Sequence, residues 1–158
     1  MKAEYINPFI QGIHEIFNEV THIPLSVTGK SLKKTKKASG NLVIMIGITG
    51  DLKGNVAINL DEQVAKRIAS NMMGGMPVET LNEIAISAVS ELGNMIMGRV
   101  STFFSHRNIA IDITPPTLLR GEKLEINYST FPLLTICFSS EDIQIHFDIA
   151  IHEKSEEQ

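Results

Sequence analysis

Apolar residues recur at helical spacing in three parts of the chain. The first part follows Pro8, a residue suited to the first helical position, and carries apolar side chains at three- and four-residue intervals. Asp61 can cap a second helix, which ends before two adjacent glycines. Thr80 and Glu83 have the spacing of a capping box that would open a third helix. The predicted helices cover residues 8–20, 61–73 and 80–104.

Six other stretches have the pattern of β-strands. The first is a nearly continuous apolar run, which is typical of a buried strand, and the last alternates apolar and polar residues strictly. Turn residues between the first two stretches favour a hairpin. Two adjacent prolines, Pro115 and Pro116, are expected to stop regular pairing. The predicted strands cover residues 42–47, 55–60, 109–113, 124–128, 133–139 and 143–151.

The order of these elements predicts the class of fold. A helix and strands are followed by two helices and more strands. This order predicts an α+β fold in which two loosely similar halves, each a helix with antiparallel strands, form a sheet covered by helices. We expect a single domain over residues 1–152 and a polar tail over residues 153–158.

Composition narrows the classes of function. The 158 residues are 43% hydrophobic, so the chain can bury a core without disulfides. A net charge of −4 argues against a nucleic-acid binder, and no apolar run is long enough to span a membrane. The N-terminus lacks the apolar core of a signal peptide, so we expect a cytoplasmic protein. One cysteine, Cys137, and five scattered histidines predict no metal site.

The third predicted helix carries one narrow polar stripe. At 100° per residue, Ser87, Asn94 and Gly98 fall within about 60° of Glu91. Most other positions of this helix are apolar, so more than half of its circumference is expected to be buried. Met97 borders the stripe. The short side chains beside Glu91 and Asn94 would let another macromolecule come close to the helix backbone.

Glu91 and Asn94 are three residues apart, so their side chains point the same way. A carboxylate can receive a lysine or arginine from a partner, and an amide can hold a water by donating and accepting at once. Such a pair can orient a nucleophilic water. The alternative is that both residues form the solvated edge of an amphipathic helix.

The polar stripe also contains a recognisable motif. The segment from Ser87 to Asn94 matches the S/D-x-x-x-E-x-x-N signature of the CheC/CheX/FliY family of chemotaxis phosphatases. Pro115 and Pro116 stand at the distance where that signature ends in a proline. The resemblance implies the CheC-like fold. Further segments resemble the same family, at residues 46–50, 72–76 and 112–117.

The resemblance implies an activity and partners. Such proteins dephosphorylate the response regulator CheY, whose own acidic residues hold Mg²⁺ beside the aspartyl phosphate, so no cofactor of the chain itself is expected. Asn94 would place a water in line with the phosphorus, and Glu91 would pair with the regulator's active-site lysine. Ser87, Gly98 and Met97 would belong to the docking surface. Relatives dimerise by sheet continuation, so we expect a homodimer through a sheet edge, and the last predicted strand is long for an edge.

Other readings remain beside this one. Gln11, Glu15 and Asn18 repeat the motif's spacing in the first helix, and we interpret them as a relic of duplication or as chance. Intact Glu91 and Asn94 favour catalysis over a non-catalytic module that docks on a receiver domain or a flagellar switch. A dense basic run can steer an acidic regulator or form a solvated loop; it comprises Lys30, Lys33, Lys34, Lys36 and Lys37.

Overall fold

The computed structural model describes residues 1–33, 41–122, 124–128 and 132–156. The helices are α1 (Ala3–Ile16), which continues into a π-helical turn η1 (Phe17–Thr21), α2 (Glu62–Met72) and α3 (Glu83–Ser105). The strands are β1 (Ser26–Lys33), β2 (Leu42–Gly50), β3 (Leu52–Leu60), β4 (Ile111–Ile113), β5 (Thr117–Arg120), β6 (Leu133–Ser140) and β7 (Ile143–Glu153). A 3-10 turn, η2 (Lys154–Glu156), follows β7.

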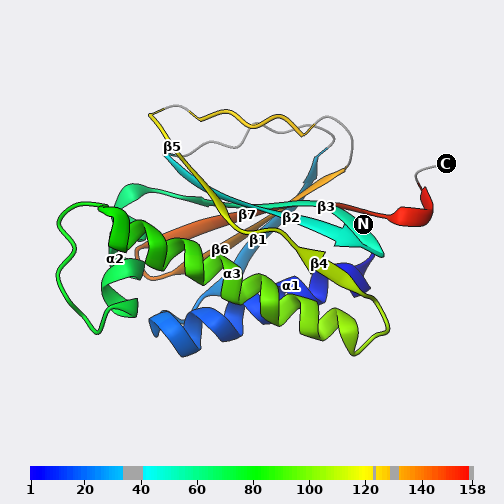
Figure 1. Cartoon of the computed structure of the whole chain (residues 1–158), viewed down its shortest axis with the longest axis horizontal. Helices are drawn as coiled ribbons and strands as arrows, with labels where there is room; N and C mark the ends of the chain where they lie inside the picture. The colour runs from blue at the N-terminus through cyan, green and yellow to red at the C-terminus, as the bar shows by residue number, and fades with distance from the viewer. Residues whose placement is uncertain (34–40, 123, 129–131, 157–158) are drawn as a thin grey trace.

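The strands form one antiparallel sheet with the order β1-β6-β7-β3-β2-β4, and β5 also pairs with β2. The helices cover one face of this sheet, with α1 and α3 side by side across it and α2 at one end (Figure 1). This arrangement confirms the predicted α+β fold with a sheet covered by helices. The long last strand, β7, lies between β6 and β3, so its interpretation as an edge is wrong.

The main core lies between the helices and the sheet. Alternate residues of the central strands point into it, and Phe9, Phe104 and Phe147 are fully buried there. A smaller apolar cluster, which includes Tyr128 and Val43, covers the other face of the sheet. Residues 124–128, predicted as a strand, belong to this second cluster and form only an isolated bridge at residue 127. Their alternation therefore records packing on a sheet face rather than strand pairing.

Two helix starts differ from the prediction. Pro8 lies inside α1, where a proline removes the hydrogen bond to the carbonyl four residues earlier. That carbonyl, of Glu4, instead accepts a hydrogen bond from the Arg107 guanidinium at 2.7 Å. At α3, the cap is Asn82, whose side-chain oxygen accepts from the Ala85 N–H at 2.9 Å, so the predicted Thr80 capping box is wrong.

Other local predictions have mixed outcomes. Asp61 does cap α2, because its carboxylate accepts from the Val64 N–H at 2.8 Å. Regular pairing does stop at the two prolines, because residues 114–116 belong to no strand, but it resumes directly after Pro116 in β5, which was not predicted. At the C-terminus, Glu153 ends β7, and its carboxylate accepts hydrogen bonds from Lys2 and Tyr5, which lower the pKa of this carboxyl. Regular structure thus extends into the predicted tail.

Candidate active site

The helix α3 lies close against the sheet because it has a glycine where the two meet. A Cβ atom at Gly93 would lie only 3.3 Å from the side chains of Ile44 and Ile46 on β2. The absence of that atom lets the helix axis approach the strands. Buried side chains continue this contact along the same face of α3: Ala85, Val89, Leu92, Ile96 and Val100. The opposite face is consequently turned toward solvent.

The predicted polar stripe occupies that outward face. Ser87, Glu91 and Gly98 are exposed, and Asn94 is half-buried. Within the described parts of the chain, the side chains of Glu91 and Asn94 have no hydrogen-bond or ion-pair partner. A Cβ built at Gly98 has nothing within 4 Å. A carboxylate and an amide are therefore presented together on a rigid helix, with open space one turn further on.

Met97 does not belong to this surface. Only 1% of the residue is exposed, and it packs in the main core. Its prediction as a docking residue is therefore wrong. On the helical wheel Met97 lies close to Ser101, whose hydroxyl donates to the Ile111 carbonyl of β4 at 3.3 Å. This flank of α3 is thus turned toward β4, which a wheel of one helix cannot reveal.

The two prolines of the motif lie between β4 and β5, next to α3 in the fold (Figure 1). The residue before them, Thr114, is tied to β2: its hydroxyl accepts from the Gly47 N–H at 2.8 Å, and its own N–H donates to the Gly47 carbonyl. A Cβ at Gly47 would lie 2.9 Å from the Thr114 methyl carbon, so the close approach of Thr114 to β2 requires glycine at residue 47. These contacts with β2 hold the segment of Pro115 and Pro116 in place beside α3.

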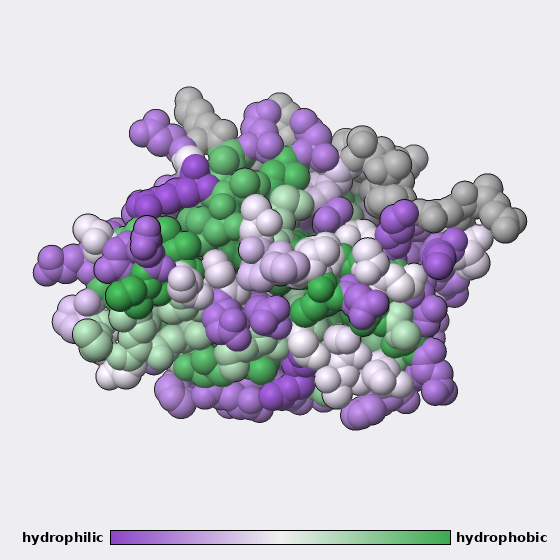
Figure 2. Space-filling view, in the orientation of Figure 1, coloured by the Kyte–Doolittle hydropathy of each residue, from purple (hydrophilic) through white to green (hydrophobic). Residues whose placement is uncertain are grey.

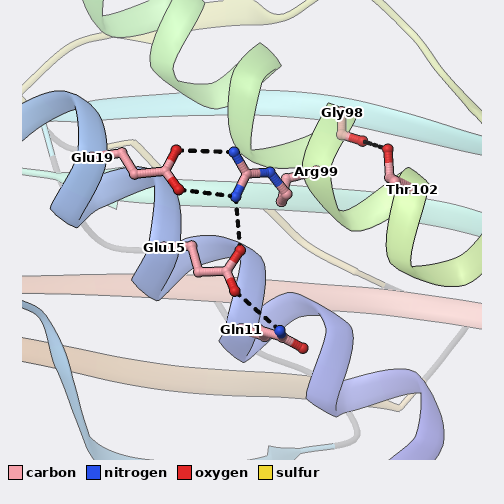
Figure 3. A network of polar contacts seen from close by, with 6 residues as sticks. All are labelled: Gln11, Glu15, Glu19, Gly98, Arg99 and Thr102. Carbon is pink, nitrogen blue, oxygen red and sulfur yellow. Dashed lines mark hydrogen bonds and ion pairs between the residues drawn. The ribbon is translucent and has the colours of Figure 1, made fainter.

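The second copy of the spacing, in α1, is in a different environment. The Glu15 carboxylate forms an ion pair with Arg99 of α3 at 2.7 Å and accepts from the Gln11 amide at 3.0 Å (Figure 3). Arg99 also binds Glu19 at 2.9 Å and lowers the pKa of that carboxyl. Asn18 is exposed, but its carboxylate neighbour is engaged, so this copy does not match the free pair on α3.

Sequence reasoning missed Arg99 as part of this network. The available signal was the pair of acidic residues Glu15 and Glu19, which stand four residues apart where α1 continues into η1 and repel each other unless a cation lies between them. Of the predicted basic run, Lys30 lies on β1, at the sheet edge remote from α3. Residues 34, 36 and 37 of that run lie outside the described residues.

The described residues contain no group of three or more His, Cys, Asp or Glu side chains placed to hold a metal ion. None of the helices in the described ranges is both long enough and apolar enough to cross a membrane.

The fold and the site place this chain in a known family. Residues 42–139 match the chemotaxis phosphatase CheX family, and the chain belongs to that family. Over 151 residues it is 34% identical to the CheY-P phosphatase CheX of Thermotoga maritima, which covers 94% of this chain and 97% of the relative. The prediction of the family from the α3 motif is therefore confirmed.

Solved structures agree with this assignment. A CheC-like superfamily protein from Shewanella superimposes with a TM-score of 0.87 and 25% identity, covering 96% of this chain and 99% of the other. The chain is also similar to a structure of the CheX–CheY–BeF3–Mg²⁺ complex from Borrelia burgdorferi, with a TM-score of 0.73 and 25% identity. That match covers 94% of this chain and 98% of the other. The predicted CheC-like fold is therefore confirmed.

Proposed function

We propose that this chain hydrolyses the aspartyl phosphate of a CheY-type receiver domain and so ends a chemotaxis signal. The observation that carries the proposal is the free pair of Glu91 and Asn94 on the exposed stripe of an otherwise buried helix. Family membership supports it, as does the phosphatase activity in the name of the Thermotoga relative. The proposal retains the cytoplasmic location expected from the sequence.

In the proposed reaction, a water oxygen bonds to phosphorus while the bond from phosphorus to the aspartate oxygen breaks. The products are a free aspartate and inorganic phosphate. Asn94 holds the attacking water in line with the phosphorus, because its amide can donate and accept at once. Half-burial limits the rotamers of Asn94, so little ordering is needed when the partner docks.

Glu91 aligns the two proteins in this proposal. Its exposed carboxylate receives a lysine from the receiver's active site, which fixes where Asn94 enters. Mg²⁺ at the phosphoryl group is held by the receiver, and this chain supplies no ligand to it. Ser87 and Gly98 form the close approach on either side, since one is small and the other has no side chain.

The test is the decay of a phosphorylated CheY-type receiver domain with Mg²⁺, in the presence and absence of this protein. We expect Asn94→Ala to lower the stimulated rate by about 10²–10³-fold, as for other single groups that act in a transition state. Asn55→Ala is the matched control, because Asn55 is exposed on β3 and pairs with Ala150, away from the helices. It should leave the rate unchanged.

A second measurement separates catalysis from docking. Binding of the receiver loaded with beryllofluoride and Mg²⁺ should survive Asn94→Ala but weaken in Glu91→Ala. If the wild-type protein binds the loaded receiver without accelerating phosphate loss, the chain is a docking module and the proposed activity is wrong. Equal rates in wild type and Asn94→Ala would remove the water-positioning role.

We also propose that the protein forms a homodimer through a sheet edge. The outer strands of the described sheet are β1 on one side and β4 with β5 on the other. Both leave backbone N–H and carbonyl groups available for a second sheet. Sedimentation at micromolar concentration should give twice the monomer mass, and a monomer would rule this out.

A further inference from the structure

Four large apolar side chains of the described residues are exposed. Val27 and Leu32 lie on the edge strand β1, whereas Met76 and Ile84 lie in the loop before α3 and in its first turn. Ile84 is 64% exposed and Met76 is 60% exposed. Figure 2 shows apolar surface over this end of the molecule, where Figure 1 places the loop from α2 to α3.

Ile84 lies on the same stripe as the candidate active site. It precedes Glu91 by two helical turns, so it is about 20° away around the axis and about 10 Å along it. In the other direction the stripe contains Gly98 and Thr102, which offer no apolar side chain of this size. Along this stripe, among the described residues, a large exposed apolar side chain therefore lies only on the N-terminal side of Glu91 and Asn94.

We propose that Ile84 is the apolar anchor for the receiver domain whose phosphoryl group reaches Asn94. This inference rests on the proposed function. A partner that places its phosphorylation site over Glu91 and Asn94 extends over neighbouring turns of α3, and the burial of Ile84 provides affinity there. A second copy of this chain is not the occupant, because it would cover the active site.

Charge identifies the matching patch on the receiver. Glu83 precedes Ile84 in the first turn of α3 and is exposed, Glu79 is exposed in the segment before that helix, and Glu91 lies two turns further on. An apolar side chain among carboxylates fits an apolar patch bordered by lysine or arginine. The receiver surface beside its phosphorylation site therefore has this composition, and receivers with an acidic patch there are poor substrates.

Ile84→Ser tests the anchor, with dephosphorylation measured over a range of receiver concentrations. We expect KM to rise about tenfold, equivalent to about 1.4 kcal/mol, with kcat unchanged. The reason is that Ile84 contributes to docking but lies two turns from the reacting atoms. Affinity for the receiver loaded with beryllofluoride and Mg²⁺ should fall by the same factor. Ile84→Val should have little effect.

Leu32→Ser is the matched control, because Leu32 is 60% exposed but lies on β1, away from α3. It should leave KM unchanged. Since Ile84 is exposed, Ile84→Ser should retain the thermal midpoint of the wild-type protein. A normal KM in a folded Ile84→Ser variant would overturn the anchor while leaving the phosphatase proposal intact. Failure of the wild-type protein itself to accelerate phosphate loss would instead overturn the proposed function.

Discussion

Replacing Gly98 with alanine should make the protein more stable and less active. Gly98 lies well inside α3, on the exposed stripe one turn beyond Asn94. Glycine in a helix interior loses more backbone entropy on folding than alanine does. If nothing but stability mattered at this position, alanine would be the better residue. The structure therefore predicts that glycine is needed here for the approach of the partner.

The size of the stabilisation follows from the surroundings of Gly98. A Cβ built there has no atom within 4 Å, so the methyl group adds helix propensity without a clash. In an exposed helix interior that difference is about 0.8–1.0 kcal/mol. For a chain of this length, it should raise the thermal midpoint by about 2–4 °C. Urea unfolding followed by circular dichroism would measure the gain directly.

The same substitution at Gly12 is the control, because its expected sign is opposite. A Cβ at Gly12 in α1 would lie 2.8 Å from a methyl carbon of Val100, a stiff and fully buried side chain of α3. Overpacking of this kind costs about 1–3 kcal/mol, which outweighs the gain in helix propensity. Gly12→Ala should therefore destabilise the protein, while Gly98→Ala stabilises it.

Activity should move against stability in Gly98→Ala. In the proposed complex the added methyl group stands between α3 and the receiver, and a displacement of about 1 Å at a reacting centre can cost about 10²-fold in rate. We expect kcat/KM to fall by at least about tenfold in the dephosphorylation assay. A stabilised Gly98→Ala with full activity would refute the close approach at this turn. No gain in stability would refute the description of Gly98 as unobstructed.

Two further predictions concern the polar contacts that hold α1. Arg107→Ala should lower the free energy of unfolding by about 1 kcal/mol, measured by urea unfolding. The loss should be smaller in a Pro8→Ala background, because the N–H of Ala at residue 8 can then donate to the Glu4 carbonyl. Equal losses in both backgrounds would contradict this link. Arg99 lowers the pKa of Glu19 in the folded protein. This pair therefore stabilises the fold above the ordinary pKa of a glutamate, about 4–5. That stabilisation is lost as the pH falls through the lowered pKa of Glu19 in the folded state. Urea unfolding from neutral to acidic pH should therefore show a smaller loss in Arg99→Met than in the wild type, and parallel curves would count against the pair.

Strong periodicity predicted most of the fold, and its failures have physical causes. The strict alternation of the last strand predicted β7 well, because β7 pairs with a strand on each side and turns alternate apolar residues toward the core. The strand β1 was missed because it is an edge strand with glycine, serine and lysine, so it has no apolar pattern to detect. The strand β5 was missed because it follows Pro116 at the sheet edge, where a proline can precede regular pairing.

The candidate site was predictable as far as one helix determines it. The wheel correctly turned Ser87, Glu91 and Gly98 outward, because the apolar majority of α3 had to face the core. It placed Met97 wrongly, because the extent of burial depends on the elements beside α3. Those elements are α1 on one flank and β4 on the other, and only the tertiary structure brings them there.

The two copies of the motif spacing now have different and connected roles. In α1 the carboxylate of Glu15 is held by Arg99, which comes from α3 itself. Arg99 is about 80° around the helix from Glu91, so the ion pairs with Glu15 and Glu19 restrain α3 on the flank next to its exposed stripe. A restraint there resists rotation of α3 about its axis. Glu15 of α1 and Glu19 of η1 therefore help to keep Glu91 and Asn94 facing outward, so the carboxylate of the first copy supports the second.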